Sequence, residues 1–189
     1  MPHVTKPAYS EIEASRAFVG HARRLLLREY LPKIERCVEL LSDEQVWWRA
    51  NPEANSIGNL LLHLSGNARQ WIVGGLGGAV DRRARPQEFA ELTQLPRVEL
   101  LARLRQTLTE VDEVLDKVDV HSLLERRSIQ GSEVTVLEAI FHVTEHFSMH
   151  TGQIIFITKM LTASDLRFYD FQDDKPVTQL TSRSTDPKS

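Results

Sequence analysis

Three histidines, His142, His146 and His150, follow one another at strict four-residue spacing and are the strongest indication of a metal site in this chain. Four residues of an α-helix advance by about 400° and about 6 Å, so the three imidazoles lie on one helical face. Neighbours at this spacing can bind one metal ion together, whereas the outer pair is about 12 Å apart along the axis. The spacing therefore predicts two metal ligands here, either His142 with His146 or His146 with His150. At least one further ligand must come from elsewhere, and neutral imidazole suits zinc, nickel, copper and iron.

The helix that carries these histidines is expected to cover about residues 134–161 and to be buried, because apolar side chains occupy most of its circumference. Gln153 lies on the same side as the histidines. An unsatisfied buried polar group costs about 1–3 kcal/mol, so these side chains need partners. A hydrogen-bonded histidine ladder is the alternative, but three histidines on one face beside a glutamine favour metal binding.

A second predicted helix, from Asn55 or Ser56 to about Val73, offers a third ligand in His63. Asn59 and Asn67 lie one turn to either side of it, within a narrow polar stripe that carries no charge. A stripe facing solvent usually carries Lys, Glu or Arg, so an inward-facing His63 is the better interpretation. The two asparagines could then orient its imidazole or a bound water.

Four long helices must position these residues, at about 10–41, 55–73, 97–118 and 134–161, and nothing indicates a repeated strand pattern. Pro32 is expected to kink or interrupt the first helix near Leu31. The connection at 122–133 has a turn signal at Gln130-Gly131-Ser132 and could form a small hairpin. The connection at 74–96 is long and rich in arginine. Its segment from Asp81 to Arg85, which includes Arg82 and Arg83, is either a solvated surface run or a clamp for the carboxylates of an acidic substrate.

Length and composition limit the domain organisation and the classes of function open to this chain. The length of 189 residues fits one domain, expected at 10–170 between a flexible N-terminus (1–9) and a flexible C-terminal tail (171–189). The net charge of −3 gives no electrostatic case for nucleic acid, and no apolar run suits a signal peptide or a membrane helix. We therefore expect a cytoplasmic protein with a small-molecule substrate. The single Cys37 excludes an internal disulfide and a cysteine-rich metal site.

Two segments together resemble the DinB/YfiT-like superfamily, whose members are regarded as metalloenzymes. They are the GNLLLHL…GN pattern at 58–67 and the EHFxxHxGQ pattern at 145–153, which resemble an uncharacterised, bacterial-type branch. The resemblance covers about residues 10–170. It implies an all-α fold, a four-helix bundle with long inter-helix connections. A homodimer is one assembly that a bundle of this kind can form. The resemblance also implies one divalent metal ion, zinc or nickel in first place and iron in second, held by His63, His146 and His150. His142, Asn59, Asn67 and Gln153 then surround these ligands or line the pocket.

Characterised members of the superfamily include transferases and isomerases that use low-molecular-weight thiols, and many members have no known activity. Three histidines leave a metal position open, as catalytic sites do. A thiol bound there would lose its proton, and a bound water would become a hydroxide. The leading hypothesis is a metal-dependent, S-transferase-like enzyme with a thiol cosubstrate, and hydrolysis is a weaker one. The alternatives are a stress-related metal- or ligand-binding bundle without turnover and a bis-histidine haem bundle that uses His63.

Overall fold

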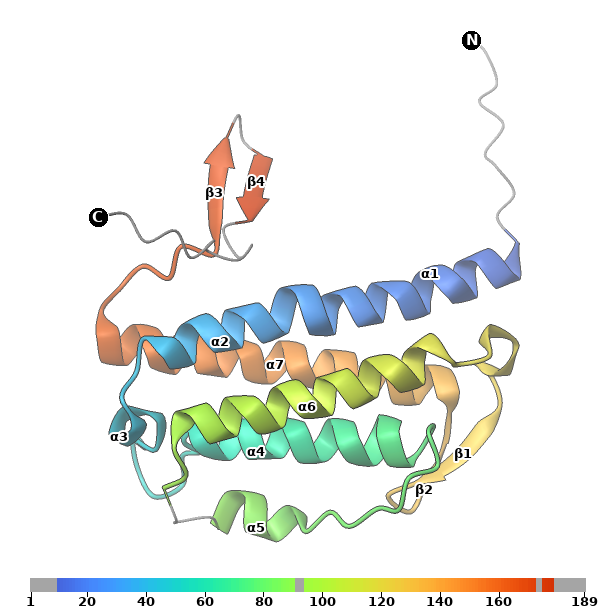
Figure 1. The fold of residues 1–189 in the computed structure, drawn as a ribbon, viewed down its shortest axis with the longest axis horizontal. Helices are drawn as coiled ribbons and strands as arrows, with labels where there is room; N and C mark the ends of the chain where they lie inside the picture. Colours follow the sequence, from blue (N-terminus) through green and yellow to red (C-terminus); the bar gives the residue numbers. More distant parts are fainter. Residues whose placement is uncertain (1–9, 91–93, 173–174, 179–189) are drawn as a thin grey trace.

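The computed structural model describes residues 10–90, 94–172 and 175–178 and confirms the predicted all-α helical bundle. Four long helical stretches run side by side along the molecule (Figure 1). The second and fourth consist of α4 (Ile57–Ala68) with the π-helical η2 (Arg69–Gly74), and of α7 (Val136–Thr162). The first and third consist of α1 (Glu11–Arg24), the π-helical η1 (Leu25–Tyr30) and α2 (Leu31–Glu39), and of α6 (Arg97–Asp116). The short helices are α3 (Asp43–Val46), α5 (Arg85–Ala90) and η3 (Val120–Ser122).

The long helices begin where side chains can satisfy the free backbone N–H groups of the first turn. Ser10, Ser56 and Thr135 each form a capping box with the residue three positions later, which starts α1, α4 and α7. Of the two caps predicted for the second helix, Ser56 is the one used. Helix α7 ends at Thr162 because Ala163 adopts a left-handed conformation with φ 50°.

Pro32 disturbs the first helix as predicted, although the helix does not stop. Proline lacks an N–H, and its ring collides with the carbonyl one turn earlier. The chain accommodates this by switching to π-helical geometry over η1, immediately before the proline, and then returns to α-helix in α2. The result is one long, irregular helix.

The core lies between the four long stretches. Helix α4 packs against both α6 and α7, and α2 packs against α7. This arrangement aims one face of α4 at the histidine-bearing face of α7. The largest fully buried side chains come from all four stretches and include Leu26, Ile34, Leu60, Leu64, Leu104, Leu108 and Phe147.

Two antiparallel β-hairpins accompany the helical bundle in the described part of the chain. Strands β1 (Arg126–Ile129) and β2 (Ser132–Thr135) confirm the predicted hairpin, whose turn places Gln130 and Gly131 at φ 52° and 77°. Strand β2 leads directly into α7. Strands β3 (Tyr169–Gln172) and β4 (Lys175–Thr178) form a second hairpin.

The second hairpin differs from the sequence prediction, which assigned 171–189 to a flexible tail. Its first residues pair instead, with Phe171 opposite Pro176. The alternation of apolar and polar residues is too short there to stand out from a polar tail. The predicted flexible segments 1–9 and 179–189 lie outside the described residues. Among those described, no helix is long and apolar enough to cross a membrane.

Candidate metal centre

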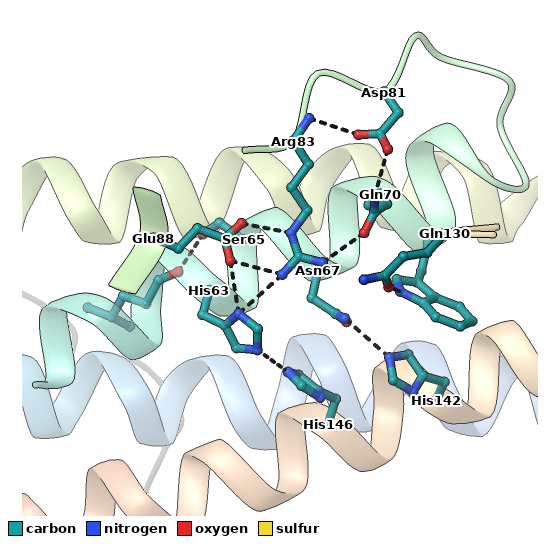
Figure 2. Close-up of polar contacts among 12 residues, drawn as sticks. His63, Ser65, Asn67, Gln70, Asp81, Arg83, Glu88, Gln130, His142 and His146 are labelled. Carbon is teal, nitrogen blue, oxygen red and sulfur yellow. Dashed lines mark hydrogen bonds and ion pairs between the residues drawn. The ribbon is translucent and has the colours of Figure 1, made fainter. Parts of the chain in front are cut away.

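Helices α4 and α7 bring His63, His146 and His150 together. One ring nitrogen of each lies within 4.8 Å of the other two, a cluster that could hold a metal ion. The Nε2 atoms of His63 and His146 are 2.8 Å apart and face each other across the gap between the helices (Figure 2). His63 and His150 are buried, and His146 is partly exposed.

Hydrogen bonds to Glu88 and Gln153 determine which ring nitrogen of His63 and of His150 is free to bind a metal ion. Glu88 can only accept, so the 2.9 Å contact between its Oε2 and His63 Nδ1 places the proton of His63 on Nδ1. His150 Nδ1 lies 2.6 Å from Gln153 Oε1 and donates to it in the same way. Both Nε2 atoms therefore keep a lone pair. This carboxylate–histidine arrangement is the one that supports metal-binding histidines in known sites.

Burial keeps the imidazoles of His146 and His150 in their neutral, ligand-competent form. Burial, with further contributions from His150, His63 and His142, lowers the pKa of His146 to about 3. Burial also lowers the pKa of His150. The carboxyl of Glu88 behaves oppositely: burial favours its neutral acid, but hydrogen bonds from Arg83 and His63 outweigh this and lower its pKa. At neutral pH the neutral imidazoles of His146 and His150 thus lie near one ionised carboxylate, that of Glu88.

Arg83 holds the carboxylate of Glu88 in place. Its Nε and Nη2 atoms donate to the two carboxylate oxygens at 2.7 and 2.9 Å, and its Nη1 donates to Gln70 Oε1 at 2.8 Å (Figure 2). The side chains of Arg83 and Glu88 are only 5% and 11% exposed. Arg83 Nη2 also lies 3.1 Å from His63 Nδ1, a close approach without a hydrogen bond because that nitrogen already carries a proton.

These contacts correct the sequence interpretation of the segment from Asp81 to Arg85. It is neither a wholly solvated run nor a set of free guanidinium groups, because Arg83 is buried against the bundle and paired internally. Arg82 and Arg85 are exposed, and Arg85 lies over the ring of Phe89. Glu88 was not identified from the sequence. Nothing in its spacing relates it to His63. The only signal was the length of the 74–96 connection, which is typical of functional or disordered loops.

Two residues of α4 allow the loop to approach so closely. A Cβ atom on Gly66 would collide with the carboxylate of Glu88, so only glycine leaves room for it. Asn59, predicted to orient His63 or a water, makes no hydrogen bond to that imidazole. It donates instead to the backbone carbonyl of Glu88 at 2.9 Å and accepts from Arg49 at 2.8 Å. Its role is therefore to anchor the loop that carries Glu88.

His142 and Asn67 form a separate pair beside the cluster. Asn67 Nδ2 lies 3.2 Å from His142 Nε2, and Trp71 stacks on the His142 ring with centroids 4.0 Å apart. His142 Nε2 therefore faces Asn67 and not the other histidines. Of the two predicted pairs on α7, the structure brings His146 and His150, not His142, together with His63. Asn67 Oδ1 is buried without a partner among the described residues, as expected where a water or ligand atom completes the contacts.

The donor set fits a small divalent ion. In a tetrahedral site with zinc–nitrogen bonds of 2.0–2.1 Å, two neighbouring nitrogen ligands lie about 3.3 Å apart. In this cluster His63 Nε2 and His146 Nε2 are 2.8 Å apart, and all three ligand nitrogens lie within 4.8 Å of one another. Imidazole nitrogens are suitable ligands for zinc, nickel, copper and iron. Haem fits poorly, because a porphyrin between His63 and His146 would have to separate two nitrogens that now lie 2.8 Å apart.

A cavity of about 390 Å³ lies on the outer side of the Arg83–Glu88 pair. None of the clustered histidines lines it. Its wall carries the guanidinium groups of four arginines and two carboxylates, from Arg69, Arg82, Arg83, Arg103, Asp81 and Glu88. The cavity therefore has more positive than negative side chains in its lining, and two of its lining residues, Arg83 and Glu88, contact His63.

Comparisons with known proteins identify the family without identifying an activity. A search of curated proteins found no match. Among solved structures, the chain is similar to a protein described as "conserved protein of locus" from Enterococcus faecalis, at 14% identity and a TM-score of 0.61. The similarity covers 83% of this chain and all of that one, and it shows a shared fold. The model of the family described as "Protein of unknown function (DUF1572)" matches residues 13–173, so the chain belongs to that family.

Proposed function

We propose that this protein is a metal-dependent enzyme of the DinB/YfiT-like type, which binds one divalent ion through His63, His146 and His150 and activates a low-molecular-weight thiol. The observation that carries the proposal is the pair of buried Nε2 lone pairs on His63 and His150. Each is set by an outer acceptor, and both lie beside the neutral imidazole of His146. Three such donors from two helices leave further coordination positions open.

When bound, the metal ion would hold a thiol as its thiolate, a nucleophile that the protein cannot supply itself. Cys37 is fully buried among core side chains, and burial raises the pKa of its thiol to about 11. The residues of the chain would bind the metal ion and orient its ligands. Glu88 and Gln153 fix the two imidazoles that they contact, and Arg83 keeps the carboxylate of Glu88 ionised.

The positive cavity beside the cluster supports a small acidic cosubstrate or substrate. Its volume falls within the range of small-molecule sites. Arg83 is already paired, so Arg82 is the better candidate to bind a carboxylate. No ion pair involves it among the described residues.

Metal analysis of protein purified without an affinity tag tests the first part of the proposal. We expect about one equivalent of zinc, nickel or iron, lost in His63→Ala and in His146→Ala, while His21→Ala on α1 keeps it. Metal retained without His63 would exclude the cross-helix site.

Cobalt substitution separates an enzyme from a closed metal-binding protein. Adding glutathione or a related thiol to the Co²⁺ form should produce a thiolate-to-cobalt absorption band and displace water. A closed site would show neither change, which would favour a bundle that binds metal without turnover.

A further inference from the structure

An apolar stripe runs along the outer face of α7. Phe141, Met149, Phe156 and Met160 are 56%, 53%, 65% and 55% exposed. They lie within about 100° of one another on the helix, so they form one continuous surface. The helix is 27 residues long and extends along the bundle (Figure 1). Large side chains this exposed on one face mark a surface that another molecule covers.

The polar residues within this stripe are arranged symmetrically about Gly152. Glu145 precedes the glycine by seven residues and Lys159 follows it by seven, and both are exposed. Neither has an ion-pair partner among residues 10–90, 94–172 and 175–178. A Cβ atom on Gly152 would meet nothing within 4 Å, so no contact inside the chain requires a glycine there.

We propose that a second copy of this chain covers the stripe, with its α7 antiparallel to the first and the twofold axis at Gly152. An antiparallel pair about this axis places position 152 − k of one helix opposite position 152 + k of the other. Glu145 of each copy then faces Lys159 of its partner, giving two equivalent ion pairs. The exposed ring of Phe156 faces the small side chain of Ser148, and the glycines allow the two backbones to approach.

The charge pattern of the stripe and the area it can bury both favour a second copy of this chain over a different protein. Opposite charges at equal distances from one residue are self-complementary only in a symmetric pair. If each of the four large side chains exposes about 100 Å² of apolar surface, the two copies together bury roughly 800 Å² from these residues alone. The polar residues of the stripe add to this, and the total approaches the 1,200–2,000 Å² of a stable interface.

Sedimentation of the full chain over a concentration series, with a charge exchange, tests the arrangement. The wild type should reach twice the mass of one chain. Glu145→Lys and Lys159→Glu should each raise the dimer dissociation constant by about tenfold or more, because each places like charges opposite each other twice. The double variant Glu145→Lys/Lys159→Glu should restore it. A monomer at all concentrations, or a dimer indifferent to both single changes, would overturn the proposal.

Cross-linking tests the position of the axis. Gly152→Cys should form an intermolecular disulfide on mild oxidation, because a residue on the twofold axis meets its own copy. Ala102→Cys, exposed on α6, should not. The native Cys37 is buried and does not compete. Equal cross-linking of both variants, or none at position 152, would refute the axis. All these measurements use metal-free protein, so their outcome does not depend on the proposed enzyme function.

Discussion

Removing Glu88 should do more than remove a supporting hydrogen bond, because Arg83 would then compete for His63. In the structure the carboxylate of Glu88 keeps the proton of His63 on Nδ1, with Arg83 Nη2 only 3.1 Å from the same nitrogen. A guanidinium can only donate. Without the carboxylate, Arg83 favours an unprotonated Nδ1, and the proton moves to Nε2. The lone pair proposed to bind metal is then lost.

The expected effects follow from these contacts. Glu88→Gln can still accept from His63, so its metal affinity should fall by about tenfold, at the lower end of the 10–100-fold usual for such outer partners. In Glu88→Ala the metal affinity should fall by more than 100-fold, which corresponds to over about 2.7 kcal/mol of binding free energy. The substitution should also destabilise the fold by about 3–5 kcal/mol, because the side chain of Arg83 is 5% exposed and would be left without a counter-charge.

The double variant Glu88→Ala/Arg83→Ala separates the two causes. If Arg83 drives the change of tautomer, removing it as well should return the affinity to about that of Glu88→Gln. Competition with a chromogenic chelator measures the affinities, and chemical unfolding of the metal-free proteins measures stability. Glu99→Gln, which disrupts an exposed ion pair with Arg103, is the matched control. An unchanged affinity in Glu88→Ala, or a double variant weaker than the single one, would refute this reasoning.

Three further predictions concern the same region. Gly66→Ala should weaken metal binding by about tenfold because its Cβ displaces the carboxylate of Glu88, whereas Gly20→Ala, with nothing within 4 Å, should leave affinity unchanged and slightly stabilise α1 in thermal unfolding. Metal-free protein should lose stability as the pH falls below 6.5. The pKa of His146 is about 3 when folded, so the unfolded chain binds more protons between these values. His146 should account for about 1 kcal/mol of the loss in unfolding free energy between pH 7 and 5, after allowing for solvent screening. Urea titrations should show that this contribution is absent in His146→Gln. His142→Ala should keep a full equivalent of metal by elemental analysis, and loss of the metal would return His142 to the ligand set.

The helices and their ends could be predicted because their signals are local. Apolar periodicity identified four long helices, and Ser56 and the turn at Gln130-Gly131 marked boundaries through hydrogen bonds that reach only a few residues. The hairpin at the C-terminal end was missed because no glycine turn signal lies between its strands, whereas Gly131 marks the turn of the equally short first hairpin. Pro32 was recognised as a disturbance, but the sequence did not predict that π-helical geometry would absorb it.

Helical spacing along the sequence fixes the relative positions of His142, His146 and His150, so their common face on a buried helix could be predicted. The uncharged polar stripe of the second helix also indicated His63. The tertiary structure was needed to show which two of the three approach His63, since that depends on how α4 and α7 are aligned. It alone placed Glu88 and Arg83 at the cluster, through a loop whose path depends on the room left by Gly66 and the anchor at Asn59. Spacing along a chain determines geometry within one helix, whereas contacts between a helix and a loop depend on packing across the whole molecule.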